Sequence, residues 1–326
     1  MAFSPMRGDP ATLDPHPRED VTLRCGDTCI TLNSRLAGAT WSMTYRGQEL
    51  ILPQPGNGGS LQSACAFDVR PGTSPEAENP TEAGNVNDNA GATSSEWKVC
   101  RVNADHTEAY TETLMAYFWP PGRPMESGPD RGPPRNTSVL SRVTLAKHLV
   151  FLAPDLLRYT VAFCLPADEP HWFAQVEALT GYMHPSTLPC RWKVAAERGM
   201  GGPFAAWTPV PSGDAPAARP GTPAEGMVYA SRDGAFAFGV AAVDWPPGGH
   251  VYAGDEAAPP WAGTWQDPYK WNYVHHFNAQ VSPEDSRIPT GALGYSFLLA
   301  TGDLERVRGV IAQATLLAAA KCRPPA

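Results

Sequence analysis

The sequence predicts an all-β protein in which antiparallel strands pack as a sandwich within a single domain. Apolar and polar residues alternate in many short runs, for example over residues 41–46 and 157–163, and this alternation is typical of strands with one buried face. The 35 prolines and 30 glycines are spread along the 326 residues, which predicts many turns and stiff loops. Only the last segment of the chain repeats apolar residues convincingly at helical spacing.

The strand pattern runs through most of the chain after an unpatterned start. Residues 1–19 are polar and rich in proline, so we expect a flexible leader followed by one domain over residues 20–326. Long Pro/Gly-rich or polar loops separate the groups of strands. We expect strands near residues 21–52, 61–69, 96–102, 107–119, 138–152, 156–165, 171–184, 226–231, 236–243, 250–253, 271–277 and 292–301.

The segment from about 303 to 320 predicts one amphipathic helix that packs on the sandwich. Leu304, Val307 and Ile311 repeat at a spacing of three and four residues, so they share one face. The acidic Glu305 lies in the first turn, where a negative charge is favoured by the helix dipole.

The charge and composition of the chain exclude several kinds of partner. The formal net charge is −8 and lysines and arginines do not cluster, so we expect neither a nucleic acid nor a membrane as a partner. No run of 18 apolar residues is present, so no membrane-spanning helix is predicted. No spacing of cysteines and histidines matches a zinc site, and neither a phosphate-binding glycine loop nor a G-x-S-x-G turn occurs, so we expect no metal and no cofactor.

The seven cysteines and the first residues leave the cellular compartment open. An odd number of cysteines cannot pair completely within one chain. Cys25 and Cys29 flank a Gly-Asp-Thr turn, and they either close a small disulfide or remain two thiols on one hairpin. The N-terminus lacks the charged and then apolar pattern of a signal peptide, which predicts a cytoplasmic protein, or a secreted or periplasmic one whose signal has been removed.

The stretch 261–277 carries the strongest functional signal. It combines aromatic side chains, which suit the faces of sugar rings, with two adjacent histidines that can move protons near neutral pH. A strand here would place Trp271, Tyr273 and His275 on one face and His276 on the other. An ordinary core strand with an incidental pair of histidines explains the same pattern equally well.

Both ends of the chain resemble the aldose 1-epimerases (galactose mutarotases) and their wider sugar-binding superfamily. The opening I-T-L-N-S-R-L-A-G-A-T-W-S-M-T-Y-R-G-Q-E-L-I is similar to their first strands. The closing G-Y-S-F-L-L-A followed by G-D-L-E-R-V-R is similar to the strand and helix that end many members. The resemblance implies a single-domain antiparallel β-supersandwich with long loops, one C-terminal helix and a concave face for sugar.

The resemblance also implies where an acid and a base would stand. In mutarotases a histidine acts as general acid and a glutamate as general base. The strand that carries their acid has its counterpart near Tyr182 and His184, and the strand that carries their base has its counterpart near His275 and His276. This late strand contains no glutamate, so the family's pair is not reproduced residue by residue.

We therefore expect a carbohydrate-active enzyme with a histidine and a glutamate as acid and base in an aromatic sugar-binding cleft. The reaction is epimerisation, or cleavage of a glycosidic bond by hydrolysis or elimination, on a mono-, oligo- or polysaccharide. The candidate catalytic residues are His275, His276, His184, Glu82, Glu177 and Tyr273. The candidate substrate-binding residues are Trp261, Trp265, Trp271, Asn79, Asn85, Asp88, Tyr182, Arg191 and Asp267.

Two other functions are compatible with the same sequence. A non-catalytic carbohydrate-binding protein would stack its tryptophans on sugar faces and would need no precisely placed acid and base. A structural or interaction β-sandwich would use the acidic, proline-rich loops for protein contacts, which explains the loops but not the cluster of histidines and aromatic residues. Histidine, glutamate and tryptophan converging in one cleft would favour the enzyme over both alternatives.

Overall fold

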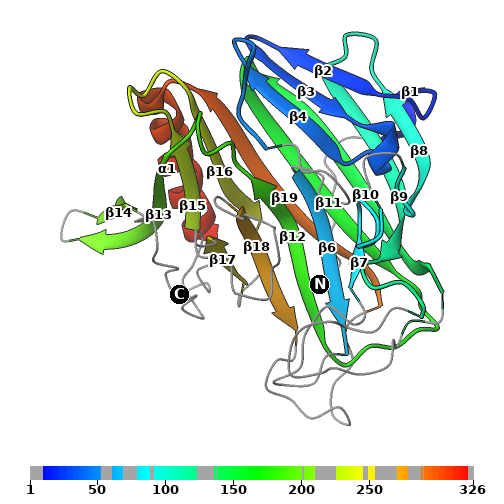
Figure 1. Ribbon diagram of the computed structural model, residues 1–326. Coiled ribbons are helices and arrows are strands. Elements are labelled where there is room, and N and C mark those ends of the chain that lie inside the picture. Colours follow the sequence, from blue (N-terminus) through cyan, green and yellow to red (C-terminus); the bar gives the residue numbers. More distant parts are fainter. Residues whose placement is uncertain are drawn as a thin grey trace.

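All strands in the described part of the chain belong to one connected, antiparallel network (Figure 1). The computed structural model describes residues 10–52, 61–68, 79–88, 92–122, 136, 138–199, 202–209, 225–244, 249–253, 270–277, 288 and 290–321. Within these residues there are nineteen strands, one α-helix and two 3-10 helices. The predicted all-β sandwich with one C-terminal helix is therefore confirmed.

The elements follow the alternation in the sequence. The strands are β1 (Asp14–Pro15), β2 (Val21–Cys25), β3 (Thr28–Leu32), β4 (Thr40–Tyr45), β5 (Gln48–Glu49), β6 (Leu61–Phe67), β7 (Pro80–Thr81), β8 (Glu96–Val102), β9 (Glu108–Tyr117), β10 (Leu140–Ala153), β11 (Leu156–Leu165), β12 (Ala174–Tyr182), β13 (Cys190–Gly199), β14 (Gly202–Pro209), β15 (Glu225–Ala230), β16 (Ala237–Asp244), β17 (Gly249–Ala253), β18 (Lys270–Phe277) and β19 (Gly291–Gly302). The helices are η1 (Pro10–Thr12), η2 (Ser34–Leu36) and α1 (Leu304–Lys321).

Two layers of strands face each other across the core. The first layer has the order β1–β8–β9–β10–β11–β19–β16–β15–β13–β14. The second layer has the order β2–β3–β4–β6–β12–β18–β17, with β5 paired to β4. The short strand β7 pairs with β6 and with β9, and it therefore joins the two layers. In Figure 1, β6, β12 and β18 lie in front of β10, β11 and β19.

Alternating side chains explain how the two layers pack. In β2 the apolar Val21 and Leu23 are buried, whereas Thr22 and Arg24 are exposed. The same alternation in other strands turns an apolar face inward from each layer. One continuous cluster of buried side chains contains residues of both layers, such as Tyr159 of β11 and Val176 of β12. Removal of this apolar surface from water is the main force that holds the sandwich together.

The helix α1 covers part of the outer face of the first layer, against β13, β15, β16 and β19. A methyl group added at Gly239 of β16 would lie 2.4 Å from Cγ1 of Ile311, so this glycine allows the helix to approach the sheet closely. Asp303 Oδ1 accepts a hydrogen bond of 2.8 Å from the backbone N–H of Arg306 and caps the first turn. The predicted amphipathic helix is confirmed. In the described part of the chain, no helix has the length and apolar character needed to cross a bilayer.

Part of the segment expected as a flexible leader packs against the sandwich. Asp14 and Pro15 pair with β8, and Leu13 beside them is buried. The backbone N–H of His16 donates to the carbonyl of Cys100 at 2.9 Å. These residues therefore belong to the sandwich, while the prediction of one domain over 20–326 stays a prediction.

Cys25 and Cys29 are two separate thiols rather than a disulfide. Cys29 pairs with Arg24 on the outer face of the hairpin, where the Arg24 Nε–H donates to Cys29 Sγ at 3.1 Å. Cys25 packs against the core on the opposite face. Because neighbouring positions of a strand point to opposite faces, the short spacing in sequence does not bring the two sulfur atoms together.

Candidate functional site

Three neighbouring strands of the second layer, β6, β12 and β18, carry polar side chains on the face that points away from the core. Directly paired residues of neighbouring strands point to the same side of a sheet. The register pairs Gln175 of β12 with His276 of β18. It also pairs Thr180 of β12 with Asn272 of β18 and with Gln62 of β6. We call this surface the polar face; its members are Gln62, Gln175, Glu177, Thr180, Tyr182, Lys270, Asn272 and His276.

A β-bulge in β12 brings Glu177 and Thr180 onto this same face. The register of β12 shifts after Glu177 relative to both β18 and β6. In a regular strand, residues three positions apart would point to opposite faces, and the extra residue of a bulge reverses this. The Thr180 Oγ1–H accordingly donates to Glu177 Oε2 at 3.2 Å. The bulge therefore gives the half-buried carboxylate a hydroxyl donor within its own strand.

A chain of hydrogen bonds links the histidine and the glutamate of the polar face. Gln175 Nε2 donates to Glu177 Oε1 at 3.4 Å, and Gln175 Oε1 lies 3.0 Å from His276 Nε2. An ionised carboxylate can only accept, so the amide nitrogen of Gln175 must face Glu177 and its oxygen must face His276. His276 Nε2 consequently carries a proton and donates it to the amide oxygen. The second proton of a charged His276 ring would then sit on Nδ1.

Two buried acceptors of the polar face have no hydrogen-bond donor among the described residues. They are Asn272 Oδ1 and Gln62 Oε1, and their side chains lie on either side of Thr180 in the register. Asn272 is 5% exposed and Gln62 is 9% exposed. Buried polar atoms are normally paired, so these two oxygens are acceptors that a donor outside the described residues can satisfy.

The alternation expected for residues 271–277 is confirmed, and it turns three candidates toward the core. Trp271 stacks on Phe238, with ring centroids 5.9 Å apart, and the Tyr273 hydroxyl donates to the carbonyl of Val240. His275 is buried, and its Nδ1 lies 3.0 Å from the Tyr295 hydroxyl. Trp271, Tyr273 and His275 therefore point away from His276 and the polar face.

Glu82 forms an ion pair with Lys147 in the protein interior. Its Oε1 lies 2.5 Å from Lys147 Nζ, and both side chains are fully buried. Glu82 Oε2 accepts a hydrogen bond from the backbone N–H of Ser63, and Lys147 also donates to the carbonyl of Gly38. Burial, together with the nearby charge of Glu82, raises the pKa of Tyr159 well above its ordinary value. Glu82 lies on the core side of the second layer, and it does not join the polar face.

The polar loop that includes Asn79, Asn85 and Asp88 is held together by its own side chains. Asp88 Oδ2 accepts hydrogen bonds from the backbone N–H groups of Asn85 and Ser94, at 2.6 and 2.8 Å. The carbonyl of Asn79 accepts from the backbone N–H of Phe118. Asn85 and Asp88 therefore stabilise a loop next to β8 rather than facing His276 and Glu177.

The remaining candidates are not brought together with the polar face, except for Tyr182. The Lys270 ammonium lies 5.7 Å from the centre of the Tyr182 ring, at one end of the polar face. His184 follows β12, and its Nδ1 lies 2.9 Å from the Ser186 hydroxyl. Arg191 is buried in β13 of the first layer. The candidates Trp261, Trp265 and Asp267 lie outside the described residues.

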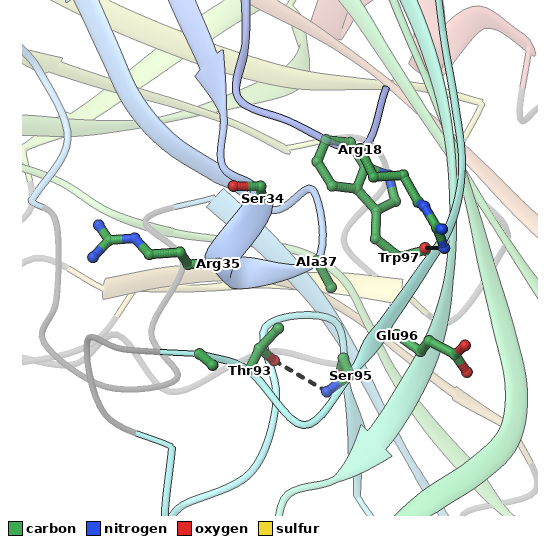
Figure 2. Close-up of a pocket in the computed structure, with 9 residues that line it drawn as sticks. Arg18, Ser34, Arg35, Ala37, Thr93, Ser95, Glu96 and Trp97 are labelled. Carbon is green, nitrogen blue, oxygen red and sulfur yellow. Dashed lines mark hydrogen bonds between the residues drawn. The ribbon is translucent and has the colours of Figure 1, made fainter. Parts of the chain in front are cut away.

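A pocket of about 410 Å³ lies elsewhere, between η2 and the start of β8 (Figure 2). Its hydroxyl groups already bond within the protein: Thr93 Oγ1 donates to the carbonyl of Ala83, and Ser95 Oγ donates to that of Thr81. These two hydroxyl groups are therefore already engaged as donors. Its lining residues are Arg18, Ser34, Arg35, Ala37, Ala92, Thr93, Ser95, Glu96 and Trp97.

Five members of the polar face were not predicted from the sequence: Gln62, Gln175, Thr180, Lys270 and Asn272. The period-two pattern of 271–277 could have indicated Asn272, since it shares a face with His276. The bulge in β12 hid Thr180, because it breaks that period between Glu177 and Thr180. Within the described residues, no three His, Cys, Asp or Glu side chains cluster as metal ligands.

Comparison with known proteins finds similarity of structure and not of sequence. No protein-family model matches the sequence, and no curated protein matches it. A protein of Escherichia coli K12 with the provisional description aldose 1-epimerase matches with a TM-score of 0.50 and 12% identity, over 87% of this chain and 99% of its own. At this identity the match shows a shared fold, and it confirms at that level the resemblance seen in the sequence.

Two further solved structures match at lower TM-scores. The GalM/aldose epimerase homologue of C. elegans has a TM-score of 0.44 and 10% identity, over 87% of this chain and 98% of its own. The GH36 α-galactosidase AgaB of Geobacillus stearothermophilus has a TM-score of 0.43 and 11% identity, over 90% of this chain and 41% of its own. The match to the Escherichia coli protein shows that the two chains share a fold.

Proposed function

We propose that this protein is a carbohydrate-active enzyme that transfers protons at the anomeric centre of a sugar, with Glu177 as general base and His276 as general acid. The observation that carries this proposal is the chain of hydrogen bonds His276–Gln175–Glu177, which holds an imidazole and a carboxylate on one half-buried face of adjacent strands. A fold shared with an aldose 1-epimerase-like structure supports the same chemistry.

The two groups suit the interconversion of sugar anomers. The Glu177 carboxylate would take the proton of the C1 hydroxyl while the His276 ring, charged and protonated on Nδ1, gives a proton to the ring oxygen. The bond between C1 and the ring oxygen breaks, and an open-chain aldehyde forms. Rotation about the C1–C2 bond and the reverse proton transfers close the ring as the other anomer. Asn272 Oδ1 and Gln62 Oε1 would accept hydrogen bonds from the sugar hydroxyls.

Cleavage of a glycosidic bond is the less favoured reaction for this face. Hydrolysis usually employs two carboxylates that flank the bond. Glu177 is the only carboxylate that the described residues of β6, β12 and β18 contribute to the polar face. Elimination needs a base and an acid of the same kinds as anomer interconversion, so the products must distinguish these two reactions.

Non-catalytic sugar binding is the second candidate function. The two unpaired acceptors, Asn272 Oδ1 and Gln62 Oε1, favour it as strongly as they favour an enzyme, because binding requires donors and acceptors but no proton transfer. In a binding protein, Glu177 and His276 would contribute only to the affinity for sugar and not to a reaction.

Exchange NMR of anomer interconversion on a panel of aldoses, with binding followed by calorimetry, tests the proposal. We expect Glu177→Gln and His276→Ala to lower the catalysed rate by roughly 10²–10⁴-fold and to keep measurable binding. Glu112→Gln and His16→Ala, which change the same residue types away from the polar face, should leave the rate unchanged. Binding by the wild type without turnover of any sugar would overturn the enzyme and leave the binding protein.

A further inference from the structure

Asp68, directly after β6, holds the turn that precedes β12. Its Oδ1 accepts hydrogen bonds from the backbone N–H groups of Trp172 and Phe173, at 2.9 and 3.3 Å. Its Oδ2 lies 3.0 Å from His171 Nδ1. Burial alone raises the pKa of Asp68, but the hydrogen bonds from His171, Trp172 and Phe173 outweigh burial and lower it. Asp68 is therefore held as a carboxylate by three donors of one turn.

The same turn is fixed from two further sides. The His171 ring stacks on Phe67 with centroids 4.2 Å apart and an angle of 19° between the planes. The carbonyl of His171 accepts a hydrogen bond of 2.8 Å from the backbone N–H of Ile288. Asp68 itself adopts a left-handed conformation with φ of 52°, which aspartate tolerates better than most residues. These contacts give the turn a single position relative to the ends of β6 and β12.

Phe173 connects this turn to His276, because its backbone bonds to Asp68 and its ring contacts the His276 ring. The backbone N–H of Asp68 donates to the carbonyl of Phe173 at 3.1 Å, so the ladder between β6 and β12 extends to this residue. Phe173 lies two positions before Gln175, and its side chain is therefore on the polar face. Its ring stacks on the His276 ring, with centroids 6.2 Å apart and an angle of 28°. The imidazole is thus bounded by the Phe173 ring and by the hydrogen bond to Gln175.

We propose that Asp68 is a positioning residue for His276 and acts through the ring of Phe173, an inference that rests on the proposed function. Loss of the carboxylate weakens the hydrogen bonds from the backbone N–H groups of Trp172 and Phe173. The ring of Phe173 is then held less firmly, and the His276 ring gains freedom to rotate about its side-chain bonds. Proton transfer requires the imidazole nitrogen within hydrogen-bond reach of the sugar oxygen, so a freer ring slows the chemical step more than it weakens binding.

The experiment compares Asp68→Asn, Phe173→Leu and Phe173→Tyr with the wild type, using D-galactose and D-glucose as substrates. The matched control is Asp168→Asn, because Asp168 is an exposed aspartate bonded to Arg142 and has no contact with Phe173 or His276 among the described residues. We measure kcat and KM for anomer interconversion, and the NMR signals of the His276 Cε1–H and Cδ2–H, which sense the ring current of Phe173.

We expect Asp68→Asn and Phe173→Leu to lower kcat roughly tenfold with KM changed less than about twofold, because they misplace a catalytic ring without removing it. Both variants should move the His276 signals in the same direction. Phe173→Tyr keeps an aromatic ring and should retain most of kcat and the wild-type signals. Asp168→Asn should change neither quantity.

Three results overturn the inference: unchanged kcat in Asp68→Asn and Phe173→Leu, a rise in KM with unchanged kcat, or Phe173→Tyr as impaired as Phe173→Leu. If Asp68→Asn does not fold, the two Phe173 variants decide. If the wild type interconverts no sugar, the proposed function fails separately, and the His276 signals still report on positioning. Signals that stay unmoved in Asp68→Asn would then reject the positioning role as well.

Discussion

Glu82 and Glu177 show how differently one residue type is used in the interior and on the polar face. Glu82 is fully buried and is compensated by the full charge of Lys147. Glu177 is half-buried, and its hydrogen-bond donors in the described part of the chain are the neutral amide of Gln175 and the neutral hydroxyl of Thr180. A buried carboxylate such as Glu82 depends on its cation, whereas the half-buried Glu177 has no cationic partner among the described residues.

The surroundings of a carboxylate depend on its place in the fold and not on its residue type. Glu82 lies beside the same strand, β6, whose other face forms part of the polar face. The buried Glu82 and the candidate base Glu177 therefore lie on opposite faces of the second layer.

The largest change in stability is expected when Lys147 is removed. We expect Lys147→Ala to lower the free energy of unfolding by roughly 3–5 kcal/mol, because Glu82 is then a buried charge without a partner. Glu177→Gln should change it by less than about 0.5 kcal/mol, since the side chain is half-buried and its neighbours are neutral. Urea unfolding followed by tryptophan fluorescence measures both values. Similar losses in the two variants would mean that Glu177 is structural too.

A double variant provides the control for this prediction. Replacing the pair together, as Lys147→Met with Glu82→Leu, removes both charges and should recover much of the lost stability. A double variant as unstable as Lys147→Ala would show that packing around Lys147, and not the unpaired charge of Glu82, causes the loss.

A smaller change in the free energy of unfolding is expected at Gly181. This glycine lies in β12, the strand that carries Glu177, and Trp271 of the core packs against it. A methyl group added there would lie 2.4 Å from Cζ2 of Trp271. We expect Gly181→Ala to cost about 1–3 kcal/mol of unfolding free energy, because the Trp271 ring must move. Gly309→Ala is the control: it lies in α1 with nothing within 4 Å and should stabilise by roughly 0.5–1 kcal/mol. No loss in Gly181→Ala would contradict the tight packing of Trp271 behind the polar face.

The smallest expected effect is a change with acid pH in the stability that Asp68 contributes. The partners of this carboxylate are a histidine and two backbone N–H groups. Its pKa is lower in the folded protein than in the unfolded chain, so its stabilising contribution is complete above the unfolded value and is lost as the pH falls through the folded value. We expect Asp68→Asn to be less stable than the wild type at neutral pH, and the difference to shrink below about pH 4. Urea unfolding at several pH values measures it, and a difference that stays constant would contradict the lowered pKa.

Local patterns in the sequence were sufficient for the class of fold and for part of the candidate site. The alternation in residues 271–277 separated His275 from His276, and the helical spacing after residue 303 predicted α1. These features depend on the backbone geometry of single elements, with periods of 2 and 3.6 residues, so no partner is needed to predict them. The same patterns named both His276 and Glu177 as candidates without relating one to the other.

Only the tertiary structure decided which candidates meet. A period of two residues says that His275 and His276 point to opposite sides, but not which side faces the other layer. Pairing of β12 with β18 brings Gln175 to His276, 101 residues away, and the fold brings Lys147 to Glu82, 65 residues away. Such contacts depend on strand register and on bulges, which arise from the packing of the whole sandwich. For this physical reason the local patterns of the chain predicted an all-β fold, and its tertiary contacts decided that Glu82 is buried in the interior and that Glu177 lies on the polar face.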